Sequence, residues 1–147
     1  MHHYTGCGLK NIWLKNGYTL KTTPYGKAVS IQNLEGLHKV IGLDLIMNKK
    51  HFSGLDIRFL RKELDLSQID LAHFFGVGDT TVRNWESGRG KIAEPAERLL
   101  RVLYREQACG DGKIKELLDR LGQLNRDNHR AKMTFEETAK GIWRTAA

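Results

Sequence analysis

The stretch Ser67–Gly88, SQIDLAHFFGVGDTTVRNWESG, carries the start and stop signals of two short helices joined by a sharp turn. Ser67 followed three residues later by Asp70 is typical of a helix start, because the hydroxyl caps a free backbone amide and the carboxylate faces the positive end of the helix dipole. Gly76 can adopt the left-handed conformation that ends a helix. The first helix is therefore expected to run from Ser67 to about Phe75.

A second helix is predicted between the turn and Gly88. Either Gly78 or Asp79 can cap its start, and Val82 and Trp85 recur at helical spacing on its expected buried face. The outward residues are Thr80, Thr81, Arg83 and Asn84. Such side chains suit a helix that reads DNA bases, because Arg pairs with guanine, Asn with adenine, and Thr offers a hydroxyl or a methyl group. The same pattern also fits a plain helical corner with a polar outer face.

The longer run LRKELDLSQIDLAHFFGVGDTTVRNWESGRG, residues 60–90, resembles the Xre/Cro-type helix-turn-helix. The shared features are L-S-Q at the second helix, a G-V turn, and W-E-S-G at the end of the recognition helix. More closely, the chain resembles the antitoxin-type regulators of the MqsA/YgiT group, which place a small N-terminal domain before the same unit. The resemblance is firm from about Leu55 to Tyr104. One departure is Gly78, with Asp79 beside it, where a Ser or Thr cap is usual, and an acid there would repel a phosphate.

The resemblance implies a recognition helix that enters the DNA major groove. We expect three residues to reach base edges: Thr80, Arg83 and Asn84. We expect four residues near helix ends to hold phosphates: Gln68, Thr81, Ser87 and Arg89. The resemblance also implies a fold-fixing ion pair between Arg61 and Glu86, for which the alternative is two unrelated surface charges. No catalytic group and no cofactor is expected.

The expected partner is double-stranded DNA with an inverted repeat, bound by a homodimer at half-sites about one helical turn (~34 Å) apart. The function expected is that of a sequence-specific transcriptional repressor, of the autoregulating antitoxin type. The alternative is a protein-interaction module whose main task is to neutralise a toxin, with DNA binding secondary. A ligand-sensing repressor has no support in the sequence beyond an N-terminal segment of unassigned purpose.

The 147 residues carry a net charge of +7, which favours a polyanionic partner. This charge is unevenly distributed. Residues 1–52 carry seven lysines and two acids, whereas residues 53–106 carry nine basic and nine acidic side chains. The expected DNA-reading unit is therefore neutral, and the N-terminal lysines are either an attraction for DNA or a solvated surface.

Other classes of protein are disfavoured. The sequence lacks a nucleophile elbow, an H-E-x-x-H pair, a Walker loop and a dinucleotide fingerprint, so an enzyme is not expected. No apolar run approaches the length of a membrane span, and no signal peptide is recognised, so a cytoplasmic location is expected. Two cysteines, Cys7 and Cys109, make a disulfide scaffold unexpected as well.

No metal is expected either. In the MqsA-like group, zinc holds the N-terminal domain through two C-x-x-C pairs, and this sequence has neither. His2, His3 and Cys7 can offer three ligands, but no second cluster completes a tetrahedral site.

The fold class expected is α+β, in three parts. Residues 1–50 are expected to form a small β-meander and a helix, and residues 51–108 an all-α helix-turn-helix domain. Residues 109–147 are expected to form a C-terminal helix over Lys113–Asn125, then a strand or hairpin that extends the N-terminal sheet.

Within the first part, the Asn16-Gly17 pair predicts a hairpin between strand-like runs at 11–14 and 18–22. A turn at Thr23–Gly26 leads to a third strand, and a helix over Asn33–Met47 is expected to pack its apolar stripe on this sheet.

A sheet of this size is too small to be stable alone, so it is expected to serve as a metal-free platform for a second copy or a toxin. Three of its aromatic residues need a cover: Trp13, Tyr18 and Tyr25. Within the chain, the nearest candidates to cover them are Phe135, Ile142 and Trp143.

Overall fold

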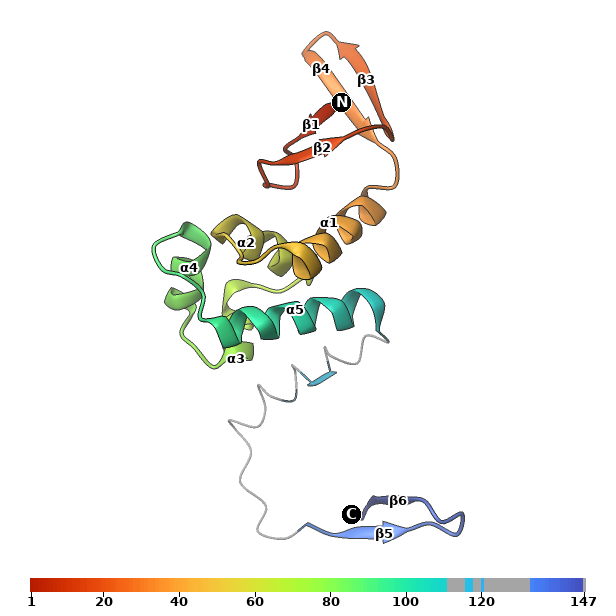
Figure 1. The fold of residues 1–147 in the computed structure, drawn as a ribbon. Helices are drawn as coiled ribbons and strands as arrows, with labels where there is room; N and C mark the ends of the chain where they lie inside the picture. Colours follow the sequence, from red (N-terminus) through yellow and green to blue (C-terminus); the bar gives the residue numbers. More distant parts are fainter. Residues whose placement is uncertain (111–115, 118–119, 121–132, 147) are drawn as a thin grey trace.

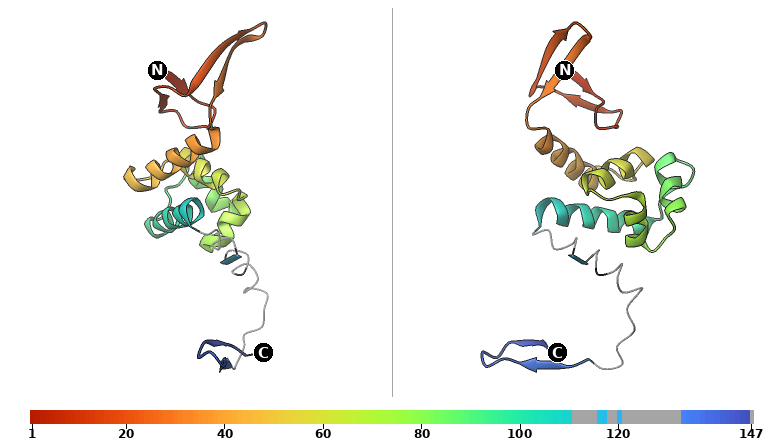
Figure 2. Two further views of the ribbon diagram at one scale, coloured as in Figure 1. Left: turned by 90° about the vertical axis from the view of Figure 1, so that its right-hand side faces the viewer. Right: turned by 180° about the vertical axis from the view of Figure 1, so that it is seen from behind.

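The computed structural model describes residues 1–110, 116, 117, 120 and 133–146. The helices pack together as one body, from which an N-terminal hairpin projects (Figures 1 and 2). In chain order the elements are β1 (His2–Tyr4), β2 (Ile12–Leu14), β3 (Tyr18–Thr23), β4 (Gly26–Ile31), α1 (Leu34–Asn48), α2 (Gly54–Glu63), α3 (Gln68–Phe75), α4 (Asp79–Ser87), α5 (Glu94–Cys109), β5 (Phe135–Glu137) and β6 (Trp143–Thr145). The α+β class is confirmed.

The limits of α2, α3 and α4 follow from local sequence. Ser53 and Ser67 cap α2 and α3, and both capping boxes are complete. In each box, the serine hydroxyl and the carboxylate of the aspartate three residues later each accept a hydrogen bond from a backbone amide. Gly76 ends α3 in the left-handed conformation, at φ 69°. The caps predicted at Ser67 and Gly76 are confirmed. At the start of α4, Gly78 holds the cap position and makes no side-chain hydrogen bond there.

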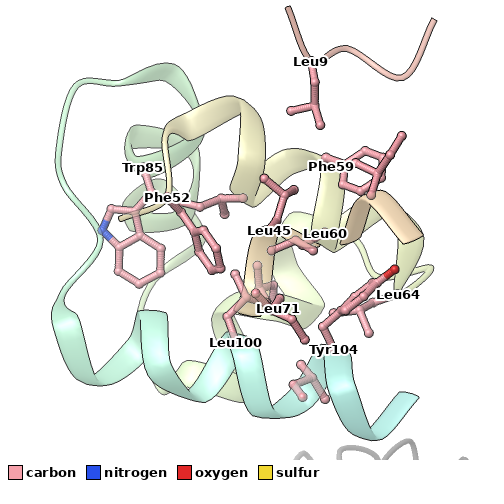
Figure 3. Packing of buried hydrophobic residues seen from close by; sticks show 14 of the residues in the cluster. Leu9, Leu45, Phe52, Phe59, Leu60, Leu64, Leu71, Trp85, Leu100 and Tyr104 are labelled. Carbon is pink, nitrogen blue, oxygen red and sulfur yellow. The ribbon is translucent and has the colours of Figure 1, made fainter. Parts of the chain in front are cut away.

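One hydrophobic core joins the helices (Figure 3). Its most buried apolar side chains come from α2, α3, α4 and α5: Ile57, Leu60, Leu71, Val82, Leu100 and Leu103. Each such residue stabilises the fold by about 1.5–3 kcal/mol through burial. Trp85 of α4 also packs edge-on against Phe75 of α3, with 5.7 Å between ring centroids. The core therefore fixes α4 against the two helices that precede it.

The helix α1 packs against α5. Its buried residues are Ile41, Gly42, Leu45 and Ile46. A Cβ atom at Gly42 would lie 2.1 Å from the phenol oxygen of Tyr104, so the close approach of the two helices requires glycine there. The sequence predicts that the apolar stripe of this helix packs on the sheet, but two of its apolar residues, Leu34 and Val40, are exposed. That part of the prediction is wrong, because the contact with α5 is centred on the face that carries Gly42.

Arg101 of α5 holds the end of α1 and the residues that follow it. Its guanidinium donates to four backbone oxygens, those of Leu45 (3.3 Å), Ile46 (2.7 Å), Lys49 (2.7 Å) and Lys50 (3.1 Å). It also donates to buried Glu97 at 2.9 Å and lies 4.2 Å from the centre of the Phe52 ring. A domain boundary at residue 50 stays a prediction, but α1 belongs to the helical body by its packing.

The N-terminal strands form two separate antiparallel pairs, not a meander. β1 pairs with β2, β3 pairs with β4, and no ladder joins β2 to β3 in the described chain. The hairpin predicted at Asn16-Gly17 is therefore wrong. Gly17 does turn the chain, at φ 79°, but β2 takes its hydrogen-bonding partner from the strand before it. The turn predicted at Thr23–Gly26 is confirmed, since these two residues face each other across the β3–β4 ladder.

A short chain of hydrogen bonds ties β1 to α1 and α2. The Tyr4 hydroxyl lies 2.8 Å from Nε2 of His38, whose Nδ1 lies 2.9 Å from a carboxylate oxygen of Glu63. Burial raises the pKa of the Tyr4 phenol, and the nearby Cys7 and Glu63 raise it further. Tyr4, Leu9 and Leu14 are also buried in the helical core. The β1–β2 pair is thus anchored on the helices.

The described part of the tail forms a hairpin of its own. β5 pairs with β6 and not with an N-terminal strand, so the expected extension of the N-terminal sheet is wrong. Phe135, Ile142 and Trp143 are exposed, as are Trp13 and Tyr25, so the expected covering of the N-terminal aromatic residues is wrong too. The physical reason is that each tail strand finds its hydrogen-bonding partner in the other. The helix expected over Lys113–Asn125 lies largely outside the described residues.

Candidate nucleic-acid interface

A polar cleft on the helical body joins residues of α2, α3, α4 and the loop after α4. Its lining side chains are Arg58, Arg61, Ser67, Gln68, Thr80, Arg83, Asn84, Glu86, Ser87 and Arg89. The structure thus brings together six of the seven residues predicted to touch DNA. The seventh, Thr81, is half-buried and does not line the cleft.

Arg61 and Glu86 form a bidentate ion pair at the floor of this cleft. Arg61 donates from Nε at 2.8 Å and from one Nη at 2.9 Å to the two carboxylate oxygens, and from its other Nη at 3.0 Å to the Leu66 backbone oxygen. The side chains are 12% and 5% exposed. Gln68, predicted to hold a phosphate, also lies 3.4 Å from a Glu86 oxygen. This network links the side chains of α2, α3 and α4.

The end of α4 is shaped by backbone contacts. Gly88 ends the helix in the left-handed conformation, at φ 82°, and the amides of Arg89 and Gly90 donate to the Asn84 oxygen at 3.0 and 3.2 Å. These bonds hold Arg89 beside the last turn of α4. The start of α2 also touches this turn, since a Cβ atom at Gly54 would lie 2.3 Å from the Glu86 backbone oxygen. The last turn of α4, at this end of the cleft, is therefore held in place by backbone contacts.

Arg83 does not extend freely into solvent. One Nη of Arg83 donates to the carboxylate of Asp79, one helical turn earlier. The hydrogen bond and the positive charge of Arg83 lower the pKa of Asp79. A residue predicted to read bases is therefore paired with the acid expected to repel phosphates.

Arg58 is a cleft residue that the sequence reasoning missed. It lies on α2, three residues before Arg61, so helical spacing places both on one face and could have identified it. Within the residues described, neither Arg58 nor Arg89 forms an ion pair, and both are exposed. The cleft thus carries two cations without a neutralising partner, at α2 and after α4, although residues 53–106 as a whole are neutral.

Two other kinds of site find no support in the described part of the chain. It contains no group of three or more His, Cys, Asp or Glu side chains placed to hold a metal ion. None of its helices combines the length and apolar character needed to cross a bilayer.

Comparison with known proteins assigns one part of the chain. Residues 57–102 match the sequence profile of the helix-turn-helix family. This match runs from α2 into α5 and contains every predicted DNA-contacting residue. No curated protein and no solved structure matches the chain.

Proposed function

We propose that this protein is a sequence-specific DNA-binding regulator of the Xre type, and that α4 is its recognition helix. The observation that carries the proposal is the cleft itself, in which Thr80, Arg83 and Asn84 of α4 line the same surface as the exposed cations Arg58 and Arg89. Phosphate contacts position a helix in the groove, and other side chains meet the base edges.

The roles follow from side-chain chemistry. Arg83 and Asn84 have the donors and acceptors to pair with guanine and adenine, and Thr80 can contact either base type. Gln68, Ser87 and Arg89 lie near helix ends, as do the usual phosphate contacts of this motif. We add Arg58 to these phosphate contacts and retain Thr81, which is half-buried, as a contact through its hydroxyl only.

We also propose that the protein acts as a homodimeric repressor on an inverted repeat. A recognition helix of nine residues, Asp79–Ser87, reaches only a few base pairs. Two copies related by a two-fold axis double the length of the site and require half-sites about one turn (~34 Å) apart.

The test is footprinting on the DNA upstream of the protein's own gene, together with the mass of the complex. We expect two protected half-sites and a dimer on the duplex. Arg98→Ala is a suitable control, because Arg98 is exposed on α5 and does not line the cleft. Protection of one unpaired half-site by a monomer would contradict the dimer, and no selective protection would contradict the DNA-reading role.

A second function is favoured by the β3–β4 hairpin. Leu20 and Val29 face each other across this hairpin, and both are exposed, as is Tyr25 at its tip. A two-stranded hairpin with an uncovered apolar face gains stability from a protein partner. The antitoxin role that the MqsA/YgiT resemblance implies would use such a platform for a toxin. Co-purification of the product of an adjacent gene, abolished by Leu20→Lys with DNA binding intact, would support this role.

A further inference from the structure

The Asp79–Arg83 ion pair lies on the outward face of α4, among the residues proposed to read bases. The two side chains are 42% and 57% exposed, so they face the solvent that DNA would replace. Since Arg83 lowers the pKa of Asp79, the carboxylate is negative at neutral pH. A negative charge is therefore held one helical turn from Arg83, the residue proposed to read a base.

The pair leaves Arg83 able to bind a base. A guanidinium has five N–H donors, and in the described structure only one Nη of Arg83 makes a hydrogen bond. A guanine edge needs two donors in a fork. Arg83 can thus keep its contact with Asp79 and still pair with guanine.

A phosphate is a different ligand for the same guanidinium. It carries a full negative charge, and its approach to Arg83 brings that charge close to the Asp79 carboxylate. Like charges at such short range repel one another, whereas the guanine edge is neutral. Asp79 therefore disfavours phosphate at Arg83 much more than it disfavours guanine.

We propose that Asp79 is a specificity-determining residue that holds Arg83 for a guanine edge and repels the phosphates Arg83 would otherwise bind at non-cognate sites. The inference rests on the proposed DNA-reading function and assigns Asp79 a positioning role within it.

The chain contains a matched control for this inference. Glu94 and Arg98 form an ion pair with the same spacing, also at the first residue of a helix, with 2.6 Å between the charged atoms. Their side chains are exposed but do not line the cleft. Loss of the acid changes the net charge and the helix-dipole interaction in the same way at both sites. Any effect confined to Asp79 must come from its place beside the DNA-reading side chains.

The experiment compares the full-length chain with Asp79→Asn, Glu94→Gln and Asp79→Glu. Fluorescence anisotropy measures binding at several salt concentrations to two duplexes: one that the wild-type protein selects from a random library, and a shuffled duplex of the same composition. For Asp79→Asn we expect the affinity ratio of selected to shuffled duplex to fall about tenfold, within the range of one good Arg–guanine contact. The salt slope on the shuffled duplex should steepen by about 0.9, the value for one further phosphate.

The controls distinguish a role of Asp79 in reading bases from a general effect of losing a negative charge at a helix start. Glu94→Gln should leave the ratio and the slope at their wild-type values, and Asp79→Glu should restore the ratio because the charge and the helical spacing are kept. In the free protein, carboxyl NMR titration should show the pKa of Asp79 rising when Arg83 is replaced by Gln.

Two outcomes would overturn the inference in distinguishable ways. If Asp79→Asn and Glu94→Gln behave alike while the wild-type protein still discriminates, Asp79 has no reading role and the proposed function stands. If the wild-type protein enriches no sequence from the library, the proposed function fails and the inference fails with it.

Discussion

Removing the Glu86 carboxylate should destabilise the protein far more than removing one partner of an exposed ion pair. Glu86→Ala leaves Arg61, only 12% exposed, without the two hydrogen bonds of 2.8 and 2.9 Å that now satisfy it. Charge-assisted bonds contribute about 1.5–3 kcal/mol each. Arg61 keeps its bond to the Leu66 oxygen, which offsets part of the loss. We expect a cost of about 3–5 kcal/mol, the range for a buried charge that has lost its partner.

Urea denaturation followed by circular dichroism measures this cost. A domain of this kind is stable by only about 5–15 kcal/mol, so the shift in the unfolding midpoint will be large. Glu94→Ala is the control, because it breaks an exposed pair with Arg98, and such pairs contribute about 0–1 kcal/mol.

A double variant identifies the cause. Arg61→Met combined with Glu86→Leu removes both charges and fills a similar volume, so it should recover most of the lost stability. The reasoning is refuted if Glu86→Ala costs no more than Glu94→Ala, because the pair would then be no more than a surface contact.

Arg83→Ala should cost about 1–3 kcal/mol of binding free energy on the selected duplex and relax base preference, whereas Arg89→Ala should weaken binding to all sequences alike and flatten the salt slope by about one unit. Anisotropy titrations on the selected and shuffled duplexes measure both effects. Equal losses on the two duplexes for Arg83→Ala would contradict its base-reading role. Gly42→Ala should destabilise by about 1–3 kcal/mol, because its Cβ would overlap the Tyr104 hydroxyl, whereas Gly90→Ala meets only a contact of 3.9 Å and should be near neutral in the same urea assay. Burial, with Glu63 and Cys109 nearby, raises the pKa of Tyr104 to about 12; the folded state then binds more protons than the unfolded state between about pH 10 and 12, so stability should fall as pH rises through this window. Tyr104→Phe should reduce that fall, and an unchanged pH profile in this variant would rule out Tyr104 as its source.

The helix-turn-helix could be predicted from the sequence because its signals are local. Ser53 and Ser67 each lie three residues from the aspartate that completes the capping box, and Gly76 ends its helix within the same short segment. Most of the residues that line the cleft could be predicted from these helix boundaries, because the start of a helix determines which of its residues face outward. Arg58 was missed because only Arg61 on that face of its helix was given a role, although the two are three residues apart.

The strand pairing could not be predicted in the same way. Asn16-Gly17 is a local turn signal, but a turn does not decide which strand is paired, and β1 pairs with β2 ahead of it. The face of α1 was ambiguous because apolar residues lie on most of its circumference, and only the approach of Tyr104 selects the face with Gly42. The role of Arg101 could not be predicted from local sequence either, because the carbonyls that it binds are 51 to 56 residues away in the chain.

The long separation in sequence between Arg101 and these carbonyls sets the order in which their contacts can form during synthesis. At a synthesis rate of about 5–20 residues per second, Arg101 is added about 3–11 s after the carbonyls at the end of α1. During this interval those oxygens lack the guanidinium that binds them, and the surface around Gly42 lacks Tyr104. The helix α4, which we propose to read DNA, is also synthesised before α5. A nascent chain that ends at Ser87 would therefore contain nearly all the residues proposed to contact DNA, together with α2 and α3, but not α5, whose Leu100 and Leu103 complete the core.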